Sequence, residues 1–235
     1  MIQTPKAVLP DDHRERKRLT MTDSLPCVEE RYEYRSIRIE RAAWRKVAGA
    51  VHGECAESVE SAGGSVFGLW RGEIGFHNDE GILLTAWPAH TEPDHATTDG
   101  IPSVIDSSVE RLVATVRPTT PEPPVDDGLY AIRWFHTTEQ HWHEFVELSS
   151  AAWPDFEGAF PGTRIVGLWR SLDAPPPEVR VLLITRYPTL AVWERSRPYE
   201  AERVPGVDEA RRRFMRRAEL TERTIVRIAK LLGPR

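Results

Sequence analysis

The sequence predicts an α+β protein built from two tandem copies of one unit, whose antiparallel sheets face each other as an α/β barrel. Three observations predict this class. The tetrapeptide GLWR occurs at 68–71 and again at 167–170, a separation of 99 residues. The residues around the two copies match at nearly the same separation, and each half of the chain shows strand-like segments around a helical pattern.

The matching blocks lie on both sides of GLWR. The segment beginning at Tyr32 matches the segment beginning at Tyr130 at a separation of 98 residues, and ILLTAWP matches LLITRYP at 100. A separation that drifts by single residues is typical of a duplicated gene with insertions in loops. The matched residues are Tyr32 and Tyr130, Arg35 and Arg133, Trp44 and Trp142, Leu83 and Leu183, Thr85 and Thr185, and Pro88 and Pro188.

Composition predicts the domain boundaries. Residues 119–128 belong to RPTTPEPPVDDG, whose four prolines and lack of large apolar residues predict a surface linker. This linker separates a first unit at 29–118 from a second unit at 129–235. Residues 1–28 are polar and show no periodicity, which predicts a flexible N-terminal extension. Met1 and Met21 are alternative starts.

In the second unit the first strand is expected at Tyr130–His136, which is rich in aromatic and β-branched residues. A helix should follow, opened by TTEQ at 137–140, which matches a capping box. The segments RIVGLW and VRVLLITRY predict buried strands, because they are short and rich in Val, Ile and Leu. A helix at Val207–Leu220 and a strand in RTIVRIAKLL complete the unit.

The first unit repeats this order with one difference. Its first helix places Trp44, Val47, Val51, Cys55 and Val59 on one face and ends at a Gly-Gly pair. The segment AHTEPDHATTDGIPSVIDSS is rich in turn formers, which predicts a degenerate second helix. The order strand, helix, strand, strand, helix, strand is the ferredoxin-like plan, with helices on one face of the sheet. The face of the sheet without helices must also be buried, and in an α/β barrel a second sheet packs against it.

Three motifs of the second unit, YAIR, RIVGLW and RYPTLAVWE, resemble the NIPSNAP family of the dimeric α/β-barrel superfamily. The resemblance covers roughly residues 129–232 and is weaker over 30–118, where YEYR, VFGLW and LTAWP remain. It implies the barrel fold. That superfamily includes cofactor-free monooxygenases, muconolactone-type isomerases, polyketide cyclases and haem-binding proteins, so the resemblance implies no single reaction.

The composition limits the classes of binding partner that are expected. The net charge is −5 with 29% charged residues, so no strong field attracts nucleic acid or an anionic membrane. No apolar run reaches the roughly 20 residues that span a bilayer. Two cysteines, Cys27 and Cys55, and an N-terminus without an apolar signal stretch indicate a cytoplasmic protein. A small molecule is the expected partner, and a homodimer is a candidate assembly.

His136 is the candidate proton carrier. Alternation places Tyr130, Trp134 and His136 on one face of their strand, and we assign this face to the barrel interior because a helix-packing face should be smaller. His136 ends the strand where a barrel mouth is expected, and imidazole can move a proton near neutral pH. A structural, partly exposed histidine is the alternative. Arg186, or Arg133, is the candidate partner for an anionic substrate.

Aromatic side chains are the candidate substrate contacts. Gly68 and Gly167 each precede a tryptophan on the same strand face, and a strand glycine marks the close approach of a ligand or of another backbone. Helix packing explains these glycines equally well. The candidate substrate-binding residues are Tyr130, Trp134, Trp169, Trp70 and Arg38, the last of which matches His136 in the repeat.

The sequence predicts no metal and no cofactor. His141 and His143 are two residues apart on a predicted helix, so their side chains point about 200° apart. No Cys-x-x-Cys, His-Glu-x-x-His or phosphate-binding glycine pattern is present. Haem bound through His52 or a histidine of the second unit is an open alternative.

These features favour a small-molecule-binding α/β barrel. One hypothesis is a cofactor-independent isomerase, cyclase or monooxygenase acting on a hydrophobic or aromatic substrate. The rival hypothesis is a noncatalytic ligand-binding or protein-interaction module, and a haem-binding barrel protein is a third. The sequence does not decide whether the chain is an enzyme.

Overall fold

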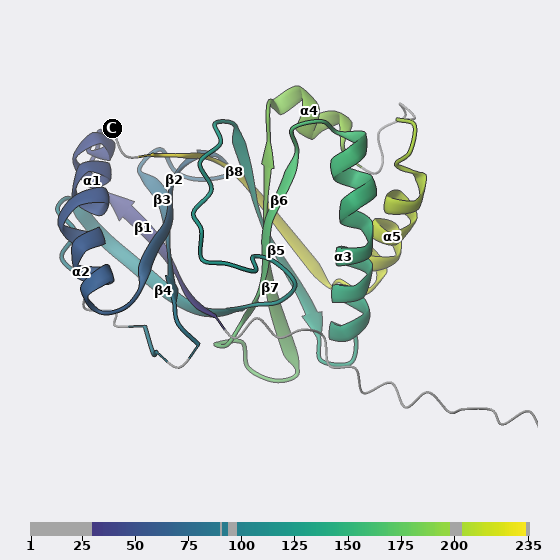
Figure 1. The fold of residues 1–235 in the computed structure, drawn as a ribbon, viewed down its shortest axis with the longest axis horizontal. Coiled ribbons are helices and arrows are strands. Elements are labelled where there is room, and N and C mark those ends of the chain that lie inside the picture. The colour runs from purple at the N-terminus through teal and green to yellow at the C-terminus, as the bar shows by residue number, and fades with distance from the viewer. Residues whose placement is uncertain (1–29, 90, 94–97, 198–203, 234–235) are drawn as a thin grey trace, which may run out of the picture.

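The computed structural model describes residues 30–89, 91–93, 98–197 and 204–233 (Figure 1). The proposed N-terminal extension and the choice of start lie outside these residues. The first half contains strands β1 (Arg31–Ile39), β2 (Ser65–Ile74), β3 (Glu80–Trp87) and β4 (Val104–Ala114), with helices α1 (Trp44–Ala50) and α2 (Ala56–Ser61) joined by a π-helical turn at Val51–Cys55. The second half contains strands β5 (Leu129–Thr138), β6 (Arg164–Ser171), β7 (Glu178–Tyr187) and β8 (Arg223–Leu231), with helices α3 (Trp142–Ala159), α4 (Leu190–Arg195) and α5 (Asp208–Glu219).

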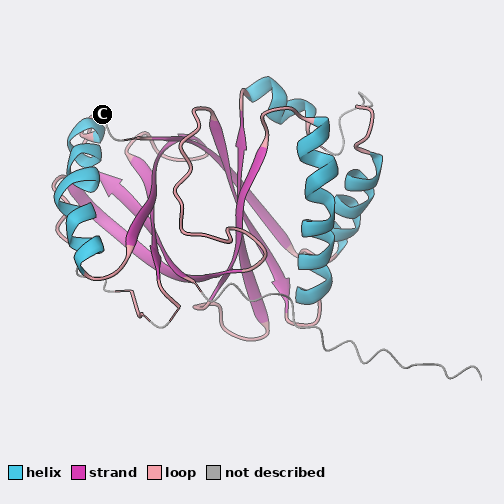
Figure 2. Ribbon diagram, in the orientation of Figure 1, coloured by secondary structure: helices cyan, strands magenta, loops and turns pink. Residues whose placement is uncertain are grey.

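The eight strands close into one barrel, in the order β4-β1-β3-β2-β8-β5-β7-β6. Each half therefore has the same internal order, with its fourth strand beside its first and its third beside its second. All pairings are antiparallel, and the halves join where β2 pairs with β8 and β4 pairs with β6. Helices cover the two outer sides of the barrel (Figure 2). The predicted class, two ferredoxin-like units whose sheets face each other, is confirmed.

Three apolar clusters follow from this arrangement. One fills the barrel interior with side chains from both units, and the other two pack each outer sheet face against its helices. In β5, Tyr130 and Ile132 belong to the interior cluster, whereas Ala131 and Phe135 pack under the helices. This is the assignment expected from the alternation along the strand. Among the described residues, no helix is both long and apolar enough to cross a membrane.

The first unit has one long helical segment, and its described residues include no counterpart of α5. The predicted apolar stripe is present, since Val47, Val51, Cys55 and Val59 are all buried. Within the described part of 88–103, β3 leads to β4 without an α-helix. The expected degenerate second helix is consistent with this finding. As a result, much of the outer face of β4 is exposed.

The predicted capping box is wrong. Residues 137 and 138 continue β5, because both pair with residues at the start of β7. The Thr137 hydroxyl donates to the Leu220 carbonyl oxygen at 2.6 Å instead of to a helix N–H group. Helix α3 has His141 at its N-cap position, with no side-chain hydrogen bond there. Strand pairing therefore outweighs the local capping signal.

The repeated GLWR motif has a structural explanation. The indole ring of each tryptophan folds back over the glycine two residues earlier. A Cβ atom added at Gly68 would lie 2.3 Å from Cη2 of Trp70, and one added at Gly167 would lie 2.4 Å from Cη2 of Trp169. The space beside these glycines is thus filled by the protein's own tryptophans, which corrects the suggestion of ligand space there.

The two tryptophans then contact tyrosines of the opposite unit. Trp169 lies edge to face against Tyr32, with ring centroids 5.5 Å apart, and Trp70 lies in the same manner against Tyr130 at 5.8 Å. All four side chains are fully buried. Each unit thereby supplies a tyrosine to the tryptophan of the other, and these reciprocal contacts join the two sheets across the interior.

We expect Trp169→Ala to lower the free energy of unfolding by about 3–5 kcal/mol, the usual cost of truncating a buried aromatic residue. Trp169→Phe should lower it less, because the ring contact with Tyr32 is partly kept. Chemical denaturation measures both. Val125→Ala, at an 85% exposed linker residue, is the control. A Trp169→Ala midpoint equal to that of the wild type would contradict this role.

Candidate functional site

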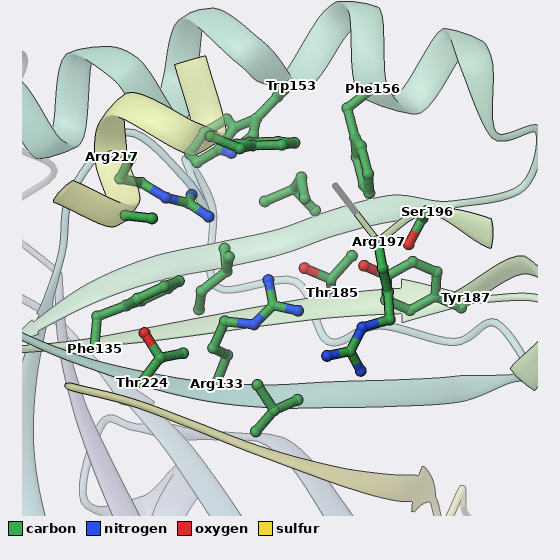
Figure 3. A pocket seen from close by; sticks show the side chains of 15 residues that line it. Arg133, Phe135, Trp153, Phe156, Thr185, Tyr187, Ser196, Arg197, Arg217 and Thr224 are labelled. Carbon is green, nitrogen blue, oxygen red and sulfur yellow. The ribbon is translucent and has the colours of Figure 1, made fainter. Parts of the chain in front are cut away.

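A partly open cavity of about 200 Å3 lies between the outer face of the second sheet and helices α3 and α5. We call it the helix-covered pocket (Figure 3). Its volume is below the roughly 300–1,000 Å3 of typical ligand pockets, so it suits a small molecule. The lining residues are Arg133, Phe135, Trp153, Phe156, Ile165, Leu183, Thr185, Tyr187, Ser196, Arg197, Phe214, Arg217, Ala218, Thr224 and Val226.

Aromatic rings form the walls of this pocket. Trp153 and Phe156 project from α3, and Phe135 and Tyr187 project from the sheet below them (Figure 3). Phe156 contacts Phe214 of α5 with ring centroids 5.3 Å apart, and Tyr187 at 6.4 Å. Because these rings pack against one another on rigid elements, the pocket is preformed.

Two arginines point into the same space from opposite sides. Arg133 extends from β5, and Arg217 extends from α5 (Figure 3). Arg217 is only 6% exposed, lies over the Phe135 ring at 4.7 Å, and donates one hydrogen bond, to Ser149 Oγ at 3.2 Å. Burial, with the charge of Arg133 as a smaller cause, lowers the pKa of the Arg217 guanidinium. The pocket therefore holds poorly solvated positive charge.

The matching arginine of the first unit, Arg35, has acidic partners. Arg35 corresponds to Arg133 and is also on the outer sheet face, but its Nε donates to Glu33 Oε1 at 3.1 Å. Its Nη1 donates to Asp99 Oδ1 at 2.9 Å. In the second unit the residue that matches Glu33 is Ala131. The same arginine is thus neutralised in one unit and exposed to a cavity in the other.

The predicted aromatic residues lie inside the barrel instead of along this pocket. Trp70, Trp169 and Tyr130 are fully buried and make the reciprocal contacts described above. Trp134 packs against Tyr34 with ring centroids 5.3 Å apart. The structure therefore brings these residues together as core, and their role as substrate contacts stays a prediction.

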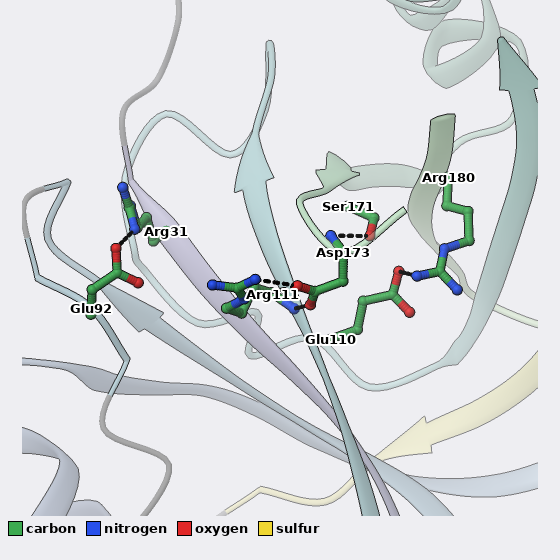
Figure 4. Close-up of polar contacts among 7 residues, drawn as sticks. All are labelled: Arg31, Glu92, Glu110, Arg111, Ser171, Asp173 and Arg180. Atoms are coloured by element: carbon green, nitrogen blue, oxygen red, sulfur yellow. Dashed lines mark hydrogen bonds and ion pairs between the residues drawn. The ribbon is translucent and has the colours of Figure 1, made fainter. Parts of the chain in front are cut away.

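His136 lies at one end of the barrel interior, as the strand pattern predicted. Its Nδ1 is 2.6 Å from Glu178 Oε1, and its side chain is 20% exposed. Nearby, Arg180 Nη2 is 3.0 Å from Glu110 Oε1 (Figure 4). Burial raises the pKa of the Glu110 carboxyl, against the opposing effects of Ser171 and Arg180. These groups form a polar, partly solvated end of the barrel.

The structure separates His136 from Arg186, the predicted anion partner. On β7, Arg186 pairs with Tyr130, whereas His136 pairs with Arg180, six residues away. At ~3.4 Å per residue this is about 20 Å, so the structure does not bring His136 and Arg186 together. Arg186 Nε donates to the Asp127 carbonyl oxygen at 2.8 Å, and its guanidinium also contacts Gly162. The Arg38 side chain is exposed, and its Nη2 lies 3.3 Å from Asp106 Oδ2.

A wider recess of about 1120 Å3 lies between the proline-rich linker and the start of β6. Tyr130 and Arg186 both line it. The Tyr130 hydroxyl donates to the Asp126 carbonyl oxygen at 2.7 Å, and Arg117 Nη1 lies 2.7 Å from Glu157 Oε1. These contacts hold the linker against the second unit.

The described histidines are poorly placed for iron. No histidine, cysteine or methionine lines the helix-covered pocket, where Tyr187 is the one side chain of a type that can ligate haem iron. His52 Nε2 is 2.7 Å from the Leu232 carbonyl oxygen, outside the barrel, and His136 contacts Glu178. No cluster of three potential metal ligands occurs in the part of the chain that the structure describes. These residues do not fit a haem group.

Sequence reasoning missed most of this pocket. From the sequence, Arg133 is only an alternative anion partner, and Arg217, which lies in the predicted helix at Val207–Leu220, is assigned no role. The spacing does carry a signal, because Phe214, Arg217 and Leu220 follow one another at intervals of three on the inner face of α5. An arginine between two apolar residues on a buried helix face indicates a charge turned inward.

No protein-family model and no curated protein matches this chain. Among solved structures, it is similar to a proposed monooxygenase from Lactobacillus acidophilus, with a TM-score of 0.55 and 11% identity over 87% of this chain and 99% of that one. It is similar to an anthrone oxidase-like protein, with a TM-score of 0.53 and 14% identity over 89% and 94% of the two chains. It is also similar to a mutant chlorite dismutase from Candidatus Nitrospira defluvii, with a TM-score of 0.53 and 10% identity over 87% of this chain and 92% of that one.

At these identities the likeness shows the fold, which is that of ferredoxin-like α/β-barrel proteins. The resemblance to NIPSNAP proteins and the origin by gene duplication stay predictions. The site must be argued from its own residues.

We expect freshly purified protein to absorb only in the aromatic band, because the helix-covered pocket offers an iron atom no histidine, cysteine or methionine among the described residues. An absorption spectrum of untreated protein, recorded before and after incubation with hemin, measures this. A Soret band that stays with the protein through gel filtration would overturn the expectation.

Proposed function

We propose that this chain binds a small hydrophobic or aromatic molecule in the helix-covered pocket. The observation behind the proposal is a partly open cavity of about 200 Å3 whose walls are aromatic rings fixed on a sheet and two helices. A concave, mostly apolar pocket with a few convergent polar groups is the usual form of a small-molecule site. A cytoplasmic location and a homodimer remain compatible with this function.

Binding of this kind suits either of the two hypotheses drawn from the sequence. A noncatalytic ligand-binding module needs only the cavity. A cofactor-independent isomerase, cyclase or monooxygenase also needs a group that moves a proton. The likeness to a proposed monooxygenase and an anthrone oxidase-like protein is compatible with such chemistry, but at 11% and 14% identity it supports the fold alone.

A second candidate is an enzyme that acts at the polar end of the barrel. What favours it is the contact of 2.6 Å between His136 Nδ1 and Glu178 Oε1, which would orient the imidazole. Nε2 would then be the nitrogen that exchanges a proton with a substrate. Arg180 lies on the same strand face as Glu178 and would attract an anionic group. This site is separate from the helix-covered pocket, which is on the outer face of the sheet.

We expect Val226→Phe to weaken binding of a neutral aromatic probe such as indole by roughly tenfold or more, a loss of about 1.4 kcal/mol. Val226 lines the pocket, so a larger side chain there takes up the space of the ligand. Titration calorimetry measures the affinity.

The matched control is Val109→Phe, because Val109 pairs with Arg35 as Val226 pairs with Arg133. Val109 faces solvent, being 37% exposed, and lines no part of the pocket. Indole that fails to bind the wild type, or that binds Val226→Phe equally well, would contradict the proposed function.

If the barrel end is catalytic, we expect His136→Gln to lower turnover by about 10²-fold, the usual loss for a general acid or base. The melting temperature should change little, because the side chain lies at a strand end. Turnover is measured on a substrate found by screening, with Glu178→Gln as the companion variant that leaves the imidazole in place. Unchanged turnover in His136→Gln would remove this residue from the mechanism.

A further inference from the structure

The lining of the helix-covered pocket is strongly biased in charge. Arg133 and Arg217 both line it, and none of the described lining residues is an aspartate or a glutamate. An isolated buried cation is costly unless an opposite charge compensates it. A pocket of this kind therefore favours a ligand that brings the negative charge with it.

Arg133 is the clearest case. Its guanidinium has no hydrogen-bond or ion-pair partner among the described residues, and its one ring contact is with Phe135, at 5.9 Å. The matched Arg35 shows what the first unit does at this position, where Glu33 and Asp99 lie within 3.1 Å of the guanidinium. Since Ala131 replaces that glutamate, the second unit leaves a fork of N–H donors directed into the cavity.

Arg217 adds a second cation that is more deeply buried. Its guanidinium lies over three phenylalanine rings, and its one hydrogen-bond acceptor among the described residues is a serine hydroxyl. Packing on the rings explains why this arginine is tolerated on the inner face of α5. It does not neutralise the charge, and burial, with the charge of Arg133 as a smaller cause, lowers the pKa of the Arg217 guanidinium.

The indole N–H of Trp153 is a further donor at the pocket. Trp153 is 2% exposed, and its Nε1 has no hydrogen-bond partner among the described residues. A buried donor without an acceptor costs about 1–3 kcal/mol, so a ligand that supplies an oxygen atom recovers that cost. Three donor groups from β5, α3 and α5 thus line one apolar cavity.

We propose that the ligand of this pocket is a compact hydrophobic oxyanion, such as an aromatic carboxylate. Its oxygen atoms would accept hydrogen bonds from Arg133 and Arg217, and its ring would lie against Trp153 and Phe156. Arginine presents paired donors whose geometry matches a carboxylate. The cavity of about 200 Å3 limits the body to about one ring system. The inference rests on the proposed function, since it names the class of molecule bound there.

Matched probes test the charge directly. Benzoate and benzamide have nearly the same shape but differ in charge, so calorimetry on the full chain compares them without any variant. We expect benzoate to bind about 10- to 100-fold more tightly, the range for hydrogen bonds to a charged group. Arg133→Gln should remove most of this preference, and Arg133→Lys should keep part of it. Arg212→Gln, on the exposed face of α5, should leave it unchanged.

The outcomes separate the two proposals. If indole and benzamide bind and Val226→Phe abolishes both, but benzoate is no tighter, the oxyanion inference fails while the pocket stands. If indole, benzamide and benzoate all fail to bind, the proposed function fails as well. Should Arg133→Gln unfold, the comparison of benzoate with benzamide on the wild type still decides. A preference for benzoate that persists in folded Arg133→Gln would overturn the role of Arg133.

Discussion

The reciprocal contact between tyrosine and tryptophan across the barrel is the interaction on which the rest of the structure depends. Tyr32 packs on Trp169, and Tyr130 packs on Trp70, so that neither unit completes its inner face alone. Each indole can lie close to its strand only because a glycine precedes it by two residues. Since aromatic rings supply much of the area buried in a core, these contacts hold the two sheets face to face. The outer faces are then left to the helices.

Once the interior is filled, the two units differ on their outer faces. The first unit keeps an acidic partner for its arginine, with Glu33 and Asp99 around Arg35, and has no counterpart of α5 among its described residues. The second unit has Ala131 in place of that glutamate and lays α5 over the sheet. Helices therefore cover both outer faces, but the arginine under them is ion-paired in the first unit and lines a cavity in the second. A shared fold thus supports a pocket in only one of its two halves.

The position of this pocket changes the chemistry expected of the chain. Trp70, Trp169 and Tyr130 were expected to contact a ligand, but they are core residues with complete burial. The tryptophan that lines a cavity is Trp153, on a helix outside the barrel. His136 and the arginines of the pocket lie on opposite faces of the same sheet, because alternate residues of a strand point to opposite sides. A binding function and a catalytic function would accordingly use different parts of the second unit.

The sequence by itself determined the fold class, since GLWR and its flanking blocks marked two equivalent units and period-two alternation identified the inner face of β5. It also placed His136 near the end of its strand, which continues to Thr138, and predicted a helix at Val207–Leu220, where α5 spans Asp208–Glu219. These features depend on local spacing, which a sequence displays directly. The local sequence pattern gave a wrong prediction where a distant strand was available for pairing. Thr137 was expected to cap a helix, but it pairs with Val179 of β7 and so belongs to β5.

Only the tertiary structure decided where the ligand site lies. Arg133 and Arg217 are 84 positions apart in the chain, and no spacing rule relates them. They meet because α5 packs over β5, and they stay without an acidic neighbour because Ala131 occupies the place of Glu33. A pocket consists of the space and charge left between elements after packing, so it appears only when the elements are placed together.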